Sequence, residues 1–224
     1  MVPSPGDVCT ALALSPSPAV LIIDDEPLVV KVLSSIIRHD QPTFSIEPCS
    51  SPRLAVQKII DGHFDAVVTD VIMPEFNGWH ILERVRDTRP CTPVLLVTGT
   101  KQATIAARAF DHGAFDFLGK PIDRPALVWS VTLAIKTHRL QRRIELRRVY
   151  IEQLRESMNR RWEQPVSVPL VGVRKPLDGS MGAAVARFEA AVAQYNKTKE
   201  RTERLLRRSH ELILERSRRW LEAP

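Results

Sequence analysis

VVTDVIMPEFNG, residues 67–78, begins as a short apolar run, reaches a single carboxylate at Asp70 and continues as a loop. The apolar run that ends here spans residues 64–69 and is predicted to be a buried strand. Met73-Pro74 starts a rigid segment after the carboxylate, and Gly78 permits a tight turn. The segment therefore predicts a strand that presents one acidic side chain at its carboxyl end.

Four further segments along the chain have the length of a strand: apolar runs at residues 19–23, 94–97 and 114–118, and a more polar segment at 43–49. Helical stretches of about 10–13 residues separate them. Two of these helices begin at Pro27 and Pro52, because proline is favoured at a first helical position. Strands joined by helices of this length imply right-handed crossovers and a parallel sheet covered on both faces. The sequence predicts a doubly wound α/β domain with a five-stranded parallel sheet.

Polar side chains gather where these strands end. In an open parallel sheet the functional crevice lies beyond the carboxyl ends of the strands. The side chains at this edge are Asp24, Asp25 and Glu26 after the first strand, Asp70 after the third, Thr98 after the fourth and Lys120 beyond the fifth. Clustered carboxylates raise each other's pKa values unless a cation compensates them, and Mg²⁺ characteristically binds one or two carboxylates. Beside a metal and a lysine, Asp70 is suited to attack phosphorus and form an aspartyl phosphate.

Four segments together resemble the receiver domain of two-component response regulators: LIIDDEP (21–27), VVTDVIMPEFNG (67–78), LLVTGT (95–100) and GAFDFLGKP (113–121). The resemblance implies the flavodoxin-like receiver fold with strand order 2-1-3-4-5. It implies a phosphoacceptor signalling protein and not an enzyme, since its only reactions would be self-phosphotransfer and autodephosphorylation. The implied cofactor is Mg²⁺, and the implied partner is a sensor histidine kinase or phosphotransfer protein.

The resemblance also assigns a role to each polar residue at the strand ends. Asp70 is the phosphoacceptor, and Thr98 and Lys120 contact the phosphoryl group. The implied metal ligands are Asp25 directly, Asp24 through water, Asp70, and Ile72 through its backbone carbonyl. Phe117 is the aromatic switch residue, and the Lys120-Pro121 peptide bond is cis.

The C-terminal half of the chain follows a different pattern. A helical pattern continues from Arg124 to about Trp162, which is far longer than an ordinary domain helix. Prolines and glycines then exclude a helix, before a second long helical pattern begins. The predicted organisation is a flexible leader (1–18), a receiver domain (19–138), a helical or coiled-coil extension (139–163), a Pro/Gly loop (164–182) and a C-terminal helix (183–224).

Charge separates the two halves. Residues 1–135 carry 11 Lys and Arg against 15 Asp and Glu, whereas residues 136–224 carry 21 against 11. Apolar residues at a spacing of three and four run along both long helices and predict a packed seam. Polar residues interrupt this seam: Arg147 in the first helix and Lys199, Ser209 and Arg216 in the second. We expect the helices to form a protein-interaction module and a homodimer.

The basic helices leave an alternative open, which is a phosphorylation-controlled regulator that binds DNA or RNA. Adjacent arginines on a helix point about 100° apart, so pairs such as Arg142-Arg143 and Arg207-Arg208 cannot all line one groove-facing strip. Interleaved glutamates also suit a surface-charged helical bundle. We therefore expect no sequence-specific DNA binding by the full-length protein.

Other readings of the sequence are weaker. A haloacid dehalogenase phosphatase is disfavoured because Glu26 stands where that family has the second aspartate of its Asp-x-Asp motif. His210 lies in a fragment similar to the phosphoacceptor box of histidine kinases, but the Arg-Thr-Pro that normally follows is absent. No apolar run approaches the length of a membrane span, and three widely spaced cysteines form no disulfide framework. We expect a cytoplasmic protein.

Overall fold

The computed structural model describes residues 17–99, 108–163 and 180–222. The described residues fall into two compact units. One, called here the sheet unit, contains residues 17–139 and 205–222, and the other, the helical unit, contains residues 140–204. The predicted leader lies almost wholly outside the described residues, as do residues 164–179 of the predicted Pro/Gly loop and residues 101–107 of a predicted helix.

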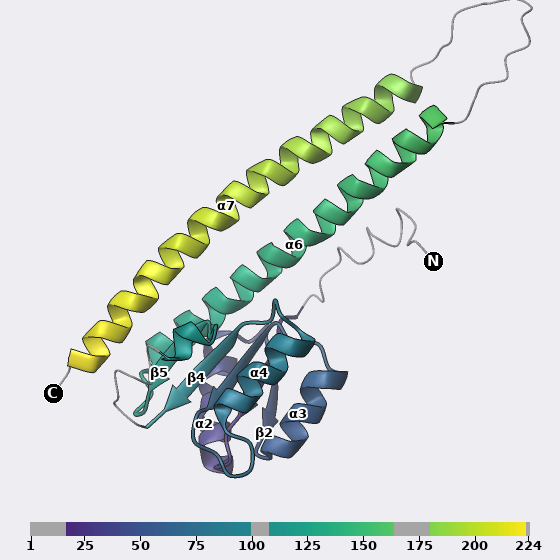
Figure 1. The fold of residues 1–224 in the computed structure, drawn as a ribbon. Coiled ribbons are helices and arrows are strands. Elements are labelled where there is room, and N and C mark those ends of the chain that lie inside the picture. Colours follow the sequence, from purple (N-terminus) through teal and green to yellow (C-terminus); the bar gives the residue numbers. More distant parts are fainter. Residues whose placement is uncertain (1–16, 100–107, 164–179, 223–224) are drawn as a thin grey trace, which may run out of the picture. The chain divides into compact units, whose positions relative to one another are not determined.

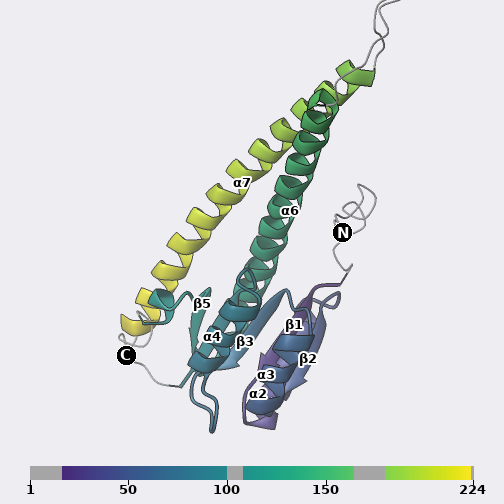
Figure 2. The same ribbon diagram turned by 45° about the vertical axis from the view of Figure 1, so that its right-hand side comes forward.

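The sheet unit is built on five parallel strands (Figures 1 and 2). They are β1 (Ala19–Ile23), β2 (Ser45–Cys49), β3 (Ala66–Asp70), β4 (Val94–Thr98) and β5 (Asp116–Gly119). Their order is β2-β1-β3-β4-β5, which confirms both the predicted parallel sheet and its predicted strand order. The register pairs Ile23 with Thr69 and Asp70 with Val97, so the carboxyl ends of the central strands lie at one edge.

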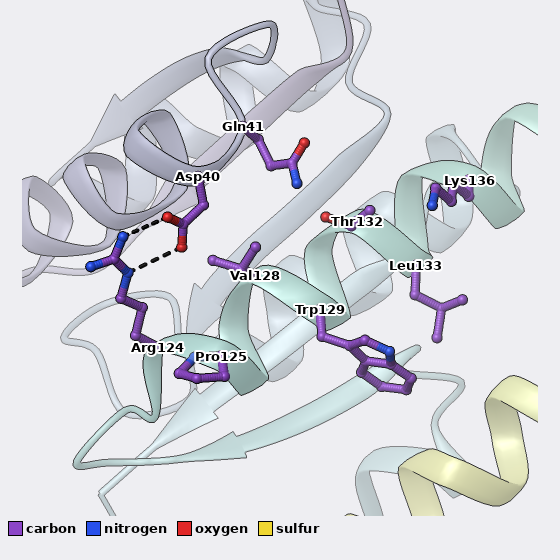
Figure 3. Close-up of a pocket in the computed structure, with 9 residues that line it drawn as sticks. All are labelled: Asp40, Gln41, Arg124, Pro125, Val128, Trp129, Thr132, Leu133 and Lys136. Atoms are coloured by element: carbon purple, nitrogen blue, oxygen red, sulfur yellow. Dashed lines mark hydrogen bonds and ion pairs between the residues drawn. The ribbon is translucent and has the colours of Figure 1, made fainter.

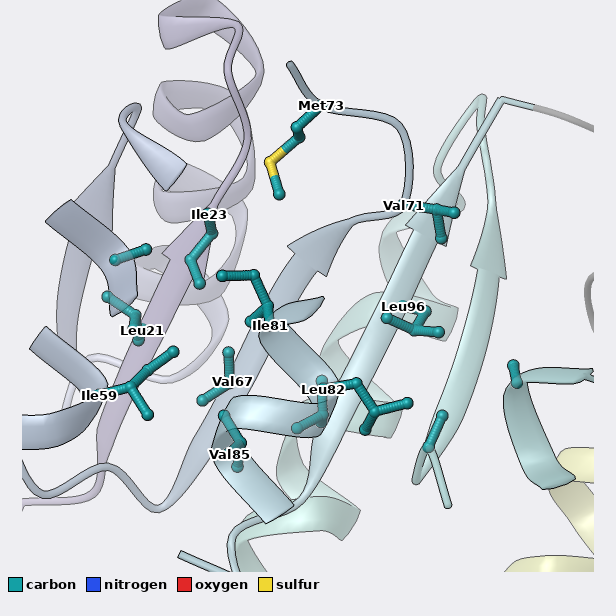
Figure 4. Packing of buried hydrophobic residues seen from close by; sticks show 14 of the residues in the cluster. Leu21, Ile23, Ile59, Val67, Val71, Met73, Ile81, Leu82, Val85 and Leu96 are labelled. Atoms are coloured by element: carbon teal, nitrogen blue, oxygen red, sulfur yellow. The ribbon is translucent and has the colours of Figure 1, made fainter. Parts of the chain in front are cut away.

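Helices cover both faces of this sheet. On one face, α3 (Pro52–Asp61) and α4 (Gly78–Thr88) pack on residues of β1, β3 and β4. Figure 4 shows Ile81, Leu82 and Val85 of α4 lying over Val67 and Leu96. On the other face, α2 (Pro27–Asp40) and the first turns of α6 (Arg124–Glu163) pack on the alternate residues of the strands. Strands buried on both faces explain the continuous apolar runs of the sequence.

Local sequence signals fix where these helices begin. Proline occupies the first turn of both α2 and α3, where no intrahelical partner is needed for its nitrogen. The Ser51 hydroxyl accepts a hydrogen bond from the Leu54 N–H at the start of α3. At the start of α4, the Asn77 side chain accepts from the N–H groups of Trp79 and His80. Such caps satisfy the free N–H groups of a helix terminus.

Two long helices make up the rest of the described chain, as predicted. α6 ends at Glu163, and α7 (Ser180–Glu222) begins three residues before the predicted start at Ala183. Within the helical unit, residues 140–163 and 180–204 lie side by side in both views (Figures 1 and 2). Arg147 joins them, because its guanidinium donates to the Thr198 hydroxyl and to the Gln194 carbonyl. In the part of the chain that the structure describes, no helix has the length and apolarity needed to cross a membrane.

Candidate functional site

Two buried carboxylates lie at the carboxyl ends of the two neighbouring strands β1 and β3. Asp24 follows β1 and is 1% exposed, whereas Asp70 ends β3 and is 6% exposed. Backbone N–H groups orient both side chains: Glu26 donates to Asp24 Oδ1 at 3.0 Å, and Ile72 donates to Asp70 Oδ2 at 2.8 Å. These bonds leave one oxygen of each carboxylate for another partner.

Lys120 supplies that partner to both carboxylates. Its ammonium nitrogen lies 2.9 Å from Asp24 Oδ2 and 2.8 Å from Asp70 Oδ1. The Lys120 backbone N–H donates to the Thr98 carbonyl at 2.7 Å, which holds the residue beside the end of β4. The Lys120–Pro121 peptide bond is cis, as the resemblance implied. One cation therefore bridges two anions at the edge of the sheet.

The pKa values of this group follow from burial and from the ion pairs. Burial raises the pKa of Asp70 above its ordinary value of 3.8, and the hydrogen bond from Lys120 offsets this only in part. Burial by itself would lower the pKa of Lys120, but the Asp70 and Asp24 carboxylates raise it above its ordinary value. The ammonium is thus held in its charged form, while the negative charge of ionised Asp70 is only partly offset by its neighbours.

The loop after Asp70 depends on a close backbone approach at Gly78. A Cβ atom added to Gly78 would lie 2.3 Å from the Asp70 carbonyl oxygen and 2.9 Å from the Val71 Cα. The Gly78 N–H also donates to the Val71 carbonyl at 3.0 Å. Glycine was predicted here for a tight turn, but the structure shows that it is needed because the start of α4 touches the backbone at Asp70.

The other predicted site residues take different positions. Thr98 is fully buried at the end of β4, and an added Cβ at its neighbour Gly99 would meet no atom within 4 Å. Asp25 is partly exposed, and the Ile72 side chain is exposed. Phe117 is buried in the core on the face covered by α3 and α4. Among the predicted residues, Lys120 contacts the side chains of both Asp24 and Asp70.

The oxygen donors at this edge suit a hard divalent cation. The described residues include no group of three or more His, Cys, Asp or Glu side chains that converges as a complete metal site. Mg²⁺ does not require one, because it commonly binds through one or two carboxylates and keeps several waters. Asp24 and Asp70 provide these carboxylates, and the raised pKa of Asp70 is the mark of an anion that a cation would stabilise.

A pocket of about 510 Å³ lies elsewhere in the sheet unit, between the end of α2 and the start of α6 (Figure 3). The Arg124 guanidinium pairs with the Asp40 carboxylate at its wall, and Trp129 and Lys136 line it further along α6. None of the predicted site residues contributes to this pocket. The candidate site at the strand ends is therefore separate from this pocket.

Sequence reasoning missed two buried acid–arginine pairs. Asp65, just before β3, accepts from the Arg139 guanidinium and from the Ala19 N–H, so it ties α6 to the start of β1. Asp116, the first residue of β5, pairs with Arg216 of α7. Arg216 looks in the sequence like an interruption of an apolar seam, and no local pattern reveals its distant partner.

Comparisons with known proteins agree with this geometry. Residues 20–132 match the family model described as the response regulator receiver domain. The transcriptional regulatory protein TcrA of Mycobacterium tuberculosis is 33% identical over 104 residues, which cover 46% of this chain and 40% of TcrA. The DNA-binding transcriptional regulator NtrC of Rhizobium meliloti is 30% identical over 116 residues, covering 52% of this chain and 24% of NtrC. The chain thus spans less than two thirds of the length of these relatives.

A solved structure shows the same similarity. A response regulator receiver domain protein from Clostridium thermocellum superimposes with a TM-score of 0.51 at 27% identity. The match covers 55% of this chain and 98% of the other protein.

Proposed function

Because the chain belongs to the response regulator receiver domain family, we propose that it is a phosphorelay protein that accepts a phosphoryl group on Asp70 in the presence of Mg²⁺. The observation that carries the proposal is the position of the Lys120 ammonium between the Asp24 and Asp70 carboxylates at the carboxyl edge of the sheet. The phosphoryl group would come from a sensor histidine kinase or a phosphotransfer protein.

The proposed reaction needs one nucleophile and charge compensation around it. A carboxylate oxygen of ionised Asp70 attacks phosphorus, a new P–O bond forms, and the bond from phosphorus to the donor breaks. The leaving group departs with the electron pair, as acetate when the donor is acetyl phosphate. The Ile72 N–H and the neighbouring ammonium orient the carboxylate beforehand.

Charge on the transferring group has to be offset by the residues around Asp70. Lys120 is charged, because its pKa is raised, and its nitrogen is already within contact of the nucleophile. We assign Thr98 to a phosphoryl oxygen, since it ends the next strand beside the open space at Gly99. Mg²⁺, held by Asp24, Asp25, Asp70 and the Ile72 carbonyl, would supply the remaining positive charge. We assign Phe117 the role of the switch residue on β5.

The output is assigned to the C-terminal helices. We propose that the receiver domain spans residues 19–138. The helical extension at 139–163 and the C-terminal helix at 183–224 together act as a protein-interaction and dimerisation module. The interhelical contact of Arg147 with Thr198 and the partly buried apolar positions of both helices support this assignment. A lone helix with an apolar stripe is marginal in water and requires a partner surface.

The phosphoacceptor proposal is tested by intact-mass measurement after incubation with acetyl phosphate and Mg²⁺. We expect one added phosphate on the wild-type protein, none on Asp70→Asn, and normal labelling of Asp87→Asn, which removes an exposed carboxylate on α4. Chelation of the metal should abolish labelling. Undiminished labelling of Asp70→Asn would reject Asp70 as the acceptor.

Binding to nucleic acid is a second candidate function, and the relative NtrC, a DNA-binding transcriptional regulator, motivates it. In the structure, exposed arginines of the long helices pair with acids on the same helix, as in Arg148–Glu145, Arg208–Glu211 and Arg219–Glu215. These pairs favour a solvated charged surface, so we expect only weak, salt-sensitive and sequence-independent binding. A sequence-selective shift at physiological salt would favour a transcription factor instead.

A further inference from the structure

One face of the last turns of α7, which belong to the sheet unit, is buried within that unit. Ser209, Ile213 and Arg216 follow one another at spacings of four and three, so they lie on the same side of the helix. Ser209 is buried, and Ile213 is 1% exposed. A coiled-coil seam would have apolar residues at all three positions, whereas Arg216 at the third position meets polar partners. This face therefore packs against other elements of the sheet unit and not against a coiled-coil partner helix.

Arg216 makes the polar contacts of this face. Its Nη2 donates to both carboxylate oxygens of Asp116, and its Nη1 lies 2.6 Å from the Ser130 hydroxyl oxygen. Asp116 on β5 and Ser130 on α6 are both 0% exposed. The guanidinium also lies 5.5 Å from the centre of the Trp129 ring. Two elements of the sheet unit, β5 and α6, thus contact one side chain of α7.

The ion pair between Arg216 and Asp116 is costly to break. A buried carboxylate requires a compensating partner, and removal of that partner leaves an uncompensated charge. β5 is the edge strand of the sheet, and an edge strand is commonly covered to prevent unwanted pairing. In the same part of α7, the His210 ring meets the Phe110 ring edge-on at a centroid distance of 6.3 Å. α7 is therefore anchored to the edge strand β5 through one specific ion pair.

β5 connects this anchor to the candidate phosphoacceptor site. The strand begins at Asp116 and ends at Gly119, and the next residue is Lys120, whose ammonium contacts Asp70. The Phe117 N–H donates to Asp116 Oδ1 at 2.7 Å, so the carboxylate that holds Arg216 is also fixed to the strand backbone. A displacement of β5 would move the carboxylate relative to α7.

We infer that residues 205–222 form an intramolecular clasp, closed by Arg216 on Asp116 of the same chain, which phosphorylation of Asp70 opens. The inference rests on the proposed phosphoacceptor function. A phosphoryl group on Asp70 occupies the space beside the Lys120 ammonium and adds negative charge, which repositions Lys120 and the end of β5. Arg216 divides its N–H donors between Asp116 and Ser130. A small displacement of β5 would weaken the ion pair, because the strength of such a pair depends on its geometry.

Hydrogen exchange of the full-length protein tests the clasp, with exchange followed by mass spectrometry in peptides from 205–222 and from β5. In the unphosphorylated protein, we expect Arg216→Ala to raise exchange in both regions by about tenfold or more. Arg218→Ala is the matched control, because Arg218 is an exposed arginine on the same helix, and it should leave exchange unchanged. Equal exchange in the two variants would overturn the clasp. Protection that disappears on dilution would also overturn it, since that result indicates a contact between chains.

The second arm adds acetyl phosphate and Mg²⁺ to the wild-type protein and to Asp70→Asn, and intact mass is measured on the same samples. We expect phosphorylated wild-type protein to exchange as Arg216→Ala does, and Asp70→Asn to remain protected. Phosphate incorporation without a change in exchange would overturn the coupling and leave the phosphoacceptor function standing. A wild-type sample that incorporates no phosphate would reject the phosphoacceptor function and the coupling, while the comparison of Arg216→Ala with Arg218→Ala still decides whether the clasp exists.

Discussion

The Lys120 ammonium nitrogen lies 2.8 Å from Oδ1 of Asp70, although the two residues are far apart in the sequence. Asp70 is the last residue of β3, and Lys120 directly follows β5. The same nitrogen contacts Asp24 at 2.9 Å, so one cation serves two buried carboxylates. Two negative charges and one positive charge leave the group with a net negative charge. Burial still raises the pKa of Asp70, which means that the ion pair does not fully compensate its charge.

Removal of the Lys120 ammonium should therefore destabilise the protein in the absence of metal. Lys120→Ala leaves Asp24 and Asp70 without the ammonium, and loss of one partner of a buried ion pair costs about 3–5 kcal/mol of unfolding free energy. Urea denaturation at pH 7 with and without Mg²⁺ measures this effect. Lys31→Ala, which removes an exposed lysine from α2, is the control and should leave stability nearly unchanged.

Mg²⁺ should restore part of the stability of Lys120→Ala, because a ligand that binds the native state stabilises it by mass action. The increment from Mg²⁺ should be larger in Lys120→Ala than in the wild-type protein, since the metal no longer competes with the ammonium. An equal or smaller increment would contradict a cation site formed by these carboxylates.

Asp70→Asn should make the protein more stable at neutral pH. The folded-state pKa of Asp70 lies above the ordinary value of 3.8, so its ionisation opposes folding at pH values above both. An amide of the same shape removes this penalty, and we expect a gain of about 1 kcal/mol. Urea titrations of Asp70→Asn and of the exposed control Asp87→Asn measure the difference.

The pH dependence of this gain has a definite sign. As pH falls through the raised pKa, the folded protein binds a proton on Asp70 and the penalty disappears. The stability advantage of Asp70→Asn should therefore be largest near pH 7 and should shrink to nothing below about pH 4, where both states are protonated. An advantage that grows toward acid pH would show that the Asp70 pKa is lowered and not raised.

The sequence was sufficient to place Asp24, Asp70 and Lys120 at one edge of the sheet. In a parallel sheet each apolar run ends at the same edge, so the residue that follows each run is positioned by the fold itself. The register that pairs Asp70 with Val97 confirms this reasoning. The sequence could not indicate that one ammonium would contact both carboxylates, because that depends on side-chain rotamers and on the path of the loop.

Two arginines show what a helical pattern leaves undetermined. Arg147 and Arg216 interrupt the predicted apolar seam, yet Arg147 donates to Thr198, and Arg216 is held by Asp116. Periodicity shows which side of a helix a residue occupies, but it does not show what lies opposite. Long side chains on an inward face can bury their stems and satisfy their charged ends at distant partners. Only tertiary structure reveals these partners.

The ion pair between Asp40 and Arg124 should control an acid titration at the end of α2. Hydrogen bonds from Arg124 lower the pKa of Asp40 from 3.8 to about 2, so the pair contributes stability that is lost as pH falls from about 4 to about 2. Arg124→Ala should return the Asp40 pKa toward 3.8, as measured by NMR titration of the carboxyl carbon. Lys136→Ala removes another cation of the same pocket (Figure 3) and should change it little.

Gly78 and Gly99 provide a matched test of how closely the loops of the site pack. A Cβ at Gly78 would lie 2.3 Å from the Asp70 carbonyl oxygen, and backbone atoms cannot yield as a flexible side chain can. Gly78→Ala should therefore lower the unfolding free energy by about 2 kcal/mol or more and impair phosphorylation by displacing Asp70. A Cβ at Gly99 would meet nothing within 4 Å, so Gly99→Ala should unfold at nearly the wild-type urea concentration. Equal stability of the two variants would show that α4 does not pack against the backbone of Asp70 as the structure places it.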